Sequence, residues 1–159
     1  YDFIMGRTTP GYKRTEFRFH SGRTEIVSLM VHKSHPLAGQ DPVDLAELAA
    51  YPWVIQEEGF PIREAIENAF HNKGVSGPSR VLNTSSLIIA LSQVAEGQAI
   101  SPQTKEVMTL LTSQELGANL TELKTSAPVV VAPYFVIQDS RRKLSRAAER
   151  VLHEVLKRM

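Results

Sequence analysis

The chain has 159 residues, of which 42% are hydrophobic and 22% are charged, and its formal net charge is +1. This composition is typical of a globular domain that can bury a real core, and it does not favour a disordered chain. The hydrophobic residues occur in short runs, far below the roughly 18 consecutive apolar residues that a membrane-spanning helix needs. Because there is no cysteine, disulfide bonds and thiolate metal sites are also excluded.

The charge pattern argues against nucleic-acid binding by this chain itself. Lysine and arginine are scattered, apart from Arg141-Arg142-Lys143 and the basic residues that follow. We interpret that cluster as the solvated face of a helix. Positive side chains near a helix C-terminus interact favourably with the helix dipole. The first residue, Tyr1, already lies in an apolar, strand-like segment, so we expect the chain to be part of a longer protein.

The first part of the chain is predicted to be rich in β-structure. Residues 1–5 read as a short strand that ends at Gly6, and residues 7–11 have the composition of a loop. Two further β-rich runs, 17–20 and 24–32, are separated by Ser21-Gly22-Arg23, a pattern that predicts a hairpin or a bent pair of strands.

In the middle of the chain, helices alternate with strands. We expect Asp41-Pro42 to open a helix over 42–50, Gly59-Phe60-Pro61 to open a second, and the polar run 83–86 to cap a third that Gly97 ends. The second helix has apolar residues at helical spacing and a stop signal at Lys73-Gly74. The expected strands here are 53–56 and 80–82.

Towards the C-terminus the same alternation continues. The predicted elements are a very short strand at 99–100, a helix over 102–111, strands at 120–123, 129–131 and 134–137, and a helix over 144–157. Because strands alternate with helices along most of the length, we expect an α/β fold with a mostly parallel sheet.

Three short apolar strands are each followed by a small or polar turn that leads into a helix. The turns follow Ile55, Leu82 and Ile100. Helix N-termini carry free N–H groups that can hold an anion or a polar ligand atom, so the three turns would form a polar cup if they met at one sheet edge. Taken singly, each turn is also explained as an ordinary helix cap.

The recognised catalytic and metal-binding motifs are missing. The sequence has no phosphate-binding glycine loop and no G-x-S-x-G nucleophile turn, so we expect no catalytic residues and no cofactor. His32 and His35 have a spacing that two metal ligands could use, but no third ligand is in view, so we expect no metal. Glu57-Glu58 is interpreted as acidic residues that enter a helix, rather than as a catalytic pair.

The chain resembles the effector-binding domain of LysR-type bacterial transcriptional regulators along nearly all of its length. The resemblance rests on four segments: residues 2–7, His35-Pro36-Leu37-Ala38-Gly39, the run 43–55, and the helix segment 85–97. One segment departs from the family pattern, because Gly97 to Pro102 is shorter and more polar than the usual glycine-rich loop.

The resemblance implies two Rossmann-like α/β subdomains of the type II periplasmic-binding-protein kind, with a small effector in the cleft between them. Residues 1–28 and 131–159 would form subdomain I, incomplete at its N-terminus, and residues 29–130 would form subdomain II. Carried over position by position, the ligand-binding residues would be Gly6, Arg7, Thr8, Gly59, Phe60, Pro61, Thr84, Ser85 and Ser101. Arg7 can pair bidentately with a carboxylate, which favours an anionic effector, although it also fits a surface or interface arginine.

The expected function is therefore effector sensing in the cytoplasm, without a membrane. Effector binding would change the oligomer, a homodimer or homotetramer, and thereby DNA binding by a winged helix-turn-helix that precedes this chain. An alternative with the same fold is an extracytoplasmic solute-binding protein of a transport system. A small α/β enzyme is a third reading, which no nucleophile and base motif supports.

Overall fold

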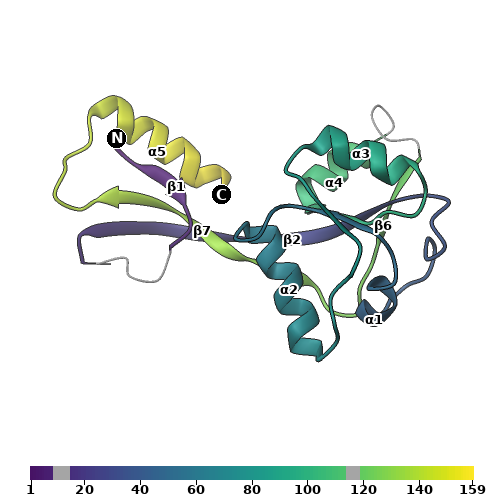
Figure 1. The fold of residues 1–159 in the computed structure, drawn as a ribbon. Helices are drawn as coiled ribbons and strands as arrows, with labels where there is room; N and C mark the ends of the chain where they lie inside the picture. The colour runs from purple at the N-terminus through teal and green to yellow at the C-terminus, as the bar shows by residue number, and fades with distance from the viewer. Residues whose placement is uncertain (9–14, 114–118) are drawn as a thin grey trace. The chain divides into compact units, whose positions relative to one another are not determined.

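Two stretches of chain, Tyr1–Thr24 and Ala132–Met159, form unit 1, and Glu25–Val131 forms unit 2 (Figure 1). The structure is a computed structural model that describes residues 1–8, 15–113 and 119–159. The last part of the expected loop over 7–11 lies outside these residues. The two units divide the chain close to the expected subdomain boundaries, and the assignment of each unit to a subdomain stays a prediction.

The described elements alternate between strands and helices. In chain order they are β1 (Ile4–Gly6), β2 (Phe17–His32), α1 (Leu45–Leu48), β3 (Trp53–Ile55), α2 (Pro61–Lys73), β4 (Val81–Asn83), α3 (Leu87–Ala95), β5 (Ser101–Thr104), α4 (Lys105–Thr112), β6 (Leu120–Leu123), β7 (Val129–Asp139) and α5 (Arg146–Arg158). Among the described residues, no helix is long and apolar enough to cross a membrane.

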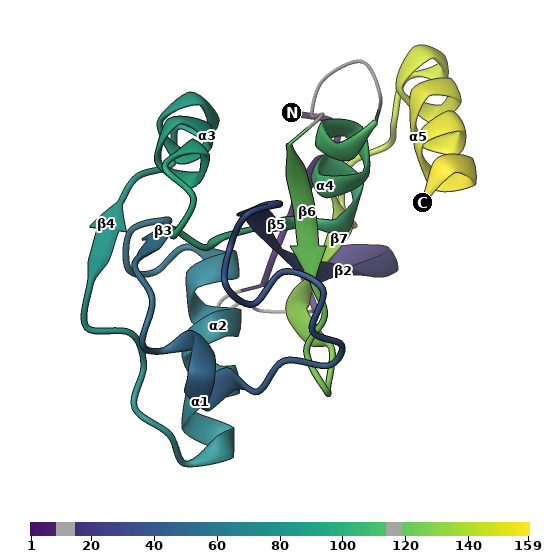
Figure 2. The same ribbon diagram turned by 90° about the vertical axis from the view of Figure 1, so that its right-hand side faces the viewer.

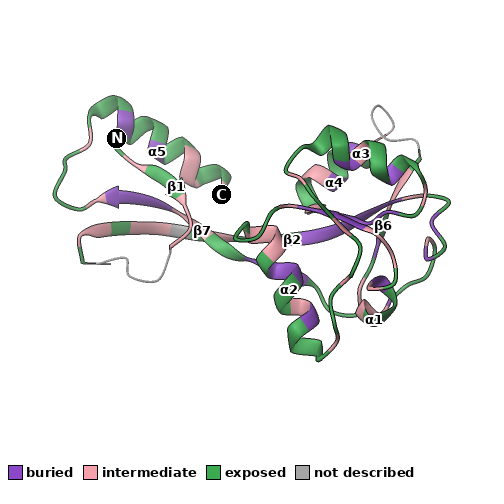
Figure 3. Ribbon diagram, in the orientation of Figure 1, coloured by how far each residue is buried: buried purple, intermediate pink, exposed green. Residues whose placement is uncertain are grey.

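Unit 1 consists of β1, parts of β2 and β7, and α5. β1 pairs antiparallel with β7, from Ile4 opposite Ile137 to Gly6 opposite Phe135. Ser145 caps α5 by accepting a hydrogen bond from the Ala148 N–H, which satisfies one of the free donors at the helix start. Figure 3 shows that most of α5 is exposed. If the upstream part of subdomain I is absent, Ile4, Phe135, Ile137 and the apolar stripe of the last helix are expected to be partly uncovered. Ile4 is 42% exposed and Phe135 is half-buried, but Ile137 is buried, so the expectation is wrong for Ile137.

Unit 2 has helices on both faces of its strands. Figure 2 shows α3 on one side of β3 and β4, and α1 and α2 on the other. Side chains alternate between the faces of a strand, and the core follows that period: Leu29 and Val31 pack in the cluster that includes α1 and α2, whereas Met30 packs with residues of α3 and α4. Each face of the strands is thus covered by its own helices.

Trp53 at the start of β3 fixes the position of the strand. Its side chain is 1% exposed, and its indole N–H donates to the Leu48 carbonyl over 2.9 Å. Its ring meets the Phe70 ring edge to face, with centroids 5.7 Å apart. A buried indole with its N–H satisfied anchors β3 against α1 and α2.

The strand pairing corrects the expectation of a mostly parallel sheet. β2 pairs antiparallel with both β5 and β6, and β1 pairs antiparallel with β7. Among the described ladders, β3 with β4 is parallel. The prediction failed because long strands, rather than crossover helices, form a large part of the sheet, and antiparallel neighbours do not need a crossover between them.

Three local predictions are also wrong. The two runs 17–20 and 24–32 are one continuous strand, β2. Helix α1 begins at Leu45 and is capped by Asp44, not by Asp41-Pro42. Residues 101–104, expected as a turn and the start of a helix, form β5, because they pair with β2 from Thr104 opposite Val27 to Ser101 opposite Met30. Tertiary pairing here overrides the local turn composition.

Gly22 explains why β2 continues through a segment that resembles a turn. A Cβ atom at this position would lie 2.5 Å from Cε1 of Phe135. Phe135 in turn meets Phe19 edge to face, with ring centroids 5.9 Å apart. Glycine is therefore required because an aromatic ring occupies the space of its missing side chain, and not because the chain turns.

We predict that Gly22→Ala lowers the free energy of unfolding by about 1–3 kcal/mol, because the added methyl group must displace the Phe135 ring. Gly77→Ala is the matched control, since a Cβ there meets nothing within 4 Å. Urea denaturation followed by circular dichroism measures both variants. Equal stability of the two variants would contradict the packing role of Gly22.

Candidate functional site

The segments after three aligned strands meet at one end of unit 2. Ile55 lies opposite Asn83 in the parallel β3–β4 ladder, and Trp53 forms a parallel bridge with Ile100. The Val54 N–H donates to the Ile100 carbonyl over 2.9 Å. Because the strands run the same way, their carboxyl ends lie at one edge, which is where α/β folds bind ligands.

A small cavity of about 40 Å³ lies at this edge. Its polar lining comes from all three segments, and the lining residues are Val54, Ile55, Gln56, Thr84, Ser85, Ser86, Leu87, Ala90, Ser101, Pro102 and Gln103. We refer to it as the polar cavity. It includes three of the predicted ligand-binding residues, Thr84, Ser85 and Ser101. Ligand pockets usually measure about 300–1,000 Å³, so this cavity has room for one group of a ligand.

The hydroxyl groups of the polar cavity are held by hydrogen bonds from neighbouring N–H groups. Thr84 Oγ1 accepts from the Ser86 N–H over 3.1 Å, and Ser101 Oγ accepts from Gln103 Nε2 over 3.1 Å. Ser86 is the N-cap of α3 and accepts from the Ile89 N–H over 3.5 Å. Each hydroxyl that accepts in this way still has its own proton to donate to a ligand.

Gln56 and Gln103 line the polar cavity and were not among the predicted site residues. Gln56 follows β3 directly, and its Oε1 atom is buried without a hydrogen-bond partner in the described structure. The sequence did contain a signal for both, because each lies in one of the turns of the expected cup. The prediction favoured glycine, serine and threonine at helix starts and passed over the amides beside them.

Gly59, Phe60 and Pro61 do not line the polar cavity. They lead into α2, where Phe60 is the N-cap residue without a side-chain hydrogen bond and Pro61 is the first helical residue. Gly59 has a φ of +82°, which favours glycine because other residues are strained there. The Phe60 side chain is 44% exposed. These residues thus have a structural role as a helix entry.

Gly6, Arg7 and Thr8 lie in unit 1, at the end of β1. The Arg7 Nε donates to the Ala132 carbonyl over 2.8 Å, and its guanidinium carbon lies 5.7 Å from the centroid of the Tyr134 ring. Contacts of this kind hold an arginine in one position through a hydrogen bond and a cation–π interaction. They give the Arg7 side chain a structural role within unit 1.

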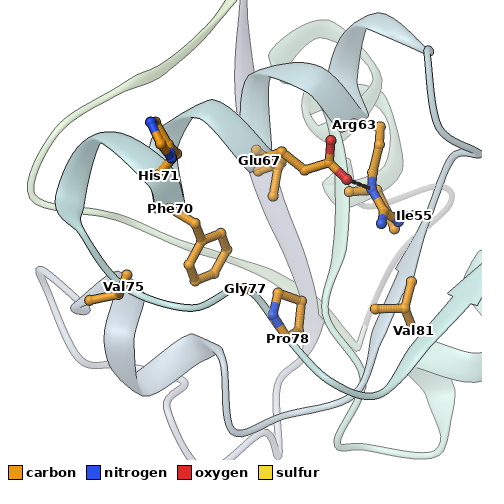
Figure 4. A pocket seen from close by; sticks show the side chains of 10 residues that line it. Ile55, Arg63, Glu67, Phe70, His71, Val75, Gly77, Pro78 and Val81 are labelled. Atoms are coloured by element: carbon orange, nitrogen blue, oxygen red, sulfur yellow. Dashed lines mark hydrogen bonds and ion pairs between the residues drawn. The ribbon is translucent and has the colours of Figure 1, made fainter.

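A second cavity, of about 290 Å³, lies between α2 and the segment that leads to β4 (Figure 4). Its wall combines apolar side chains, among them Phe70, Val75 and Val81, with polar side chains at Arg63, Glu67 and His71. Arg63 lies at one end, where its Nε pairs with Glu67 and its NH1 donates to Asn83 Oδ1 over 3.1 Å. Arg63 and Glu67, the charged residues of this wall, are therefore paired with each other.

His35 is a structural residue rather than a metal ligand. It is 3% exposed, its Nδ1 accepts from the Leu37 N–H over 3.1 Å, and its Nε2 donates to the Gln98 carbonyl over 3.2 Å. The ring also lies 4.6 Å from the Tyr51 ring. Among the described residues, no three histidine, aspartate or glutamate side chains gather as metal ligands would.

Burial lowers the pKa of His35 below its ordinary value of 6.5, against a smaller opposing effect of the Gln98 carbonyl. The unfolded chain therefore binds a proton at a higher pH than the folded chain does. Neutral His35 contributes its full stability above pH 6.5, and that contribution is lost as the pH falls below 6.5.

We predict that the melting temperature falls between about pH 7.5 and pH 5.5 and that His35→Asn reduces this slope, because an asparagine side chain does not titrate in this range. Calorimetry at several pH values measures the melting temperature of each variant. His71→Asn is the control, because His71 is exposed. An unchanged slope in the His35 variant would contradict the assignment.

Comparisons with known proteins assign the chain to a family. It belongs to the LysR substrate binding domain family, whose family model matches residues 1–159. It is similar to the HTH-type transcriptional regulator GbpR of Rhizobium radiobacter, with 33% identity over 115 residues, which are 72% of this chain and 38% of that protein. The chain therefore spans less than half of the length of this relative.

Solved structures of low sequence identity share the fold. The regulatory domain of CcmR from Synechocystis PCC6803, solved in complex with 2-PG, has a TM-score of 0.76 and 21% identity, covering 98% of this chain and 72% of that one. HinK, a LysR family transcriptional regulator from Pseudomonas aeruginosa, has a TM-score of 0.77 and 14% identity. The match covers 99% of this chain and 53% of HinK. The α/β fold is thus of the periplasmic-binding-protein-like type II kind.

Proposed function

We propose that this chain is the effector-sensing part of a LysR-type transcriptional regulator and that a small molecule binds at the polar cavity. The observation that carries the proposal is the meeting of three loops, with their hydroxyl and amide groups, beyond the ends of β3, β4 and the Ile100 segment. A binding site at this edge agrees with the family of the chain and with the general position of ligands in α/β folds.

We propose that a part of the protein outside this chain binds the DNA. The relative in Rhizobium radiobacter is named an HTH-type regulator, and this chain matches 38% of its length. A winged helix-turn-helix before this chain would bind the DNA, in a homodimer or homotetramer in the cytoplasm. Effector binding would shift the equilibrium between oligomer geometries, because the effector binds one of them more tightly.

We also propose that residues of unit 1 contact the effector. Gly6, Arg7 and Thr8 were assigned to the site by resemblance, and Arg7 was the reason to expect an anionic effector. Its hydrogen bond to the Ala132 carbonyl gives Arg7 a role without any ligand.

The lining of the polar cavity favours binding over catalysis. It contains hydroxyl and amide groups, but none of its residues is a histidine or a carboxylate that could act as a general base. A solute-binding protein of a transport system could use the same site chemistry. The family of the chain favours the regulator.

The proposal predicts that Ser85→Phe blocks the effector response and leaves DNA binding intact. Ser85 lines the polar cavity and is exposed, so a large ring there fills the cavity without entering the core. In the full-length protein, we expect the effector concentration for a half-maximal transcriptional response to rise at least tenfold. A reporter gene under the protein's own promoter measures it, and fluorescence anisotropy measures the affinity for promoter DNA.

Ser126→Phe is the matched control, because Ser126 is exposed and lies outside the cavity. A Ser85 variant that responds like this control would contradict the position of the site. A full-length protein without affinity for any promoter fragment would contradict the regulator itself and favour the transport receptor.

A further inference from the structure

We propose that His35 is a positioning residue of the polar cavity: its hydrogen bond to the Gln98 carbonyl holds the connection between α3 and β5, and protonation of the ring releases it. We call this contact the His35–Gln98 link. The inference rests on the proposed function, since it describes what holds that site in shape. The observation that carries it is a histidine that is 3% exposed and whose Nε2 donates to the Gln98 carbonyl over 3.2 Å, although the two residues are 63 positions apart.

Gln98 lies in the short connection between two parts of the cavity wall. Before it, the Gly97 N–H donates to the Val94 carbonyl at the end of α3. After it, the Ile100 N–H donates to the Pro52 carbonyl, which joins the chain to the strands. The two parts of the wall are Ser86, Leu87 and Ala90 from the start of α3, and Ser101, Pro102 and Gln103 from β5. The connection therefore sets how far apart these two parts stand.

The loop that carries His35 packs closely against this connection at a second point. A Cβ atom at Gly97 would lie 3.3 Å from the Ser34 Oγ, and Gly97 has a φ of +94°, which favours glycine. Two neighbouring residues of the loop thus contact two neighbouring residues of the connection. The loop is in place to hold the end of α3 from behind the cavity.

The tautomer that makes the link is fixed by a second hydrogen bond of the ring. The Leu37 N–H donates to the Nδ1 of His35 over 3.1 Å, so Nδ1 is an acceptor and carries no proton. The single proton of the neutral ring is then on Nε2, which is the atom that faces the Gln98 carbonyl. The loop backbone thereby selects the form of His35 that can hold the connection.

Protonation works against the link. A proton on Nδ1 would face the Leu37 N–H, so that two donors would meet, and the ring would carry its charge in a buried site. Burial lowers the pKa of His35 below 6.5, against a smaller opposing effect of the Gln98 carbonyl. The released ring therefore binds a proton more readily than the linked ring does. The link has its full stability above pH 6.5 and loses stability as the pH falls below 6.5.

No counter-charge keeps the protonated ring in place. None of the ion pairs among the described residues includes His35. The titratable groups on the segments that contact the ring are Tyr51 after α1, with its ring 4.6 Å away, His32 and Lys33 in the loop itself, and Glu96 at the end of α3. Lys33 and Glu96 are exposed, where water screens their charge.

Two variants separate the two hydrogen bonds of the ring. In His35→Asn, the side-chain oxygen can still accept from the N–H two residues on, as in an Asx turn, but the side chain is too short to reach Gln98. In His35→Gln, the side chain is one bond longer, and its NH₂ group can donate to the Gln98 carbonyl. The Asn variant thus removes the link, and the Gln variant keeps it without a group that titrates.

Hydrogen–deuterium exchange of the full-length protein measures the link without any ligand, at pH 7.5 and 5.5 and with rates corrected for the intrinsic effect of pH. At pH 7.5 we expect the amides of α3 and of Ile100–Gln103 to exchange at least about fivefold faster in the Asn variant than in the wild type, and to stay within about twofold in the Gln variant. At pH 5.5 the wild type should exchange these amides faster, and the Gln variant should not respond. The amides of α2 are the internal control, because α2 does not line the cavity.

Equal exchange in the Asn and Gln variants would overturn the inference, because the link to Gln98 would then have no effect. Faster exchange that spreads equally to α2 would also overturn it, since His35 would then serve stability in general. A wild type without a pH response at the cavity would contradict release by protonation. Fluorescence anisotropy with promoter DNA tests the proposed function separately: a wild type without affinity for its promoter would count against the regulator, whatever the exchange shows.

Discussion

The parallel alignment of β3, β4 and the short segment at Ile100 is the constraint on which the site depends. Trp53 anchors β3 against α1 and α2, the Val54 N–H donates to the Ile100 carbonyl, and β4 pairs with β3 in parallel. Because the three segments end at the same edge, the residues that follow them must lie close together. Loops far apart in the sequence thereby become the wall of one cavity.

The same alignment explains why the site is polar. Alternate residues of a strand share a face, and Val54 packs in the cluster beside α3, so Gln56, two residues further on, lies with it in the wall of the polar cavity. The helix capped by Ser86 begins at this edge and needs partners for its free N–H groups. Capping and ligand binding thus use neighbouring hydroxyls, and a single turn serves the stability of α3 and the chemistry of the cavity.

Much of the fold could be predicted from the sequence, because local signals decide it. The apolar spacing of α2, its stop at Gly74 and the serines before α3 all gave the right elements. The prediction failed where a distant contact decides: β2 runs through Gly22 because of Phe135, and β5 exists because β2 pairs with it. For the site, the three loops were visible in the sequence. The burial of the Gln56 Oε1 atom without a hydrogen-bond partner was not, because it is a property of the folded chain.

The most direct test of the account is hydrogen–deuterium exchange of the full-length protein, with and without the small molecule that changes its transcriptional response. The account predicts that the ligand slows exchange of the backbone amides around Thr84–Leu87 and Ser101–Gln103, at the polar cavity. Protection confined to the second cavity, between α2 and the segment that leads to β4, with none at the polar cavity, would contradict it.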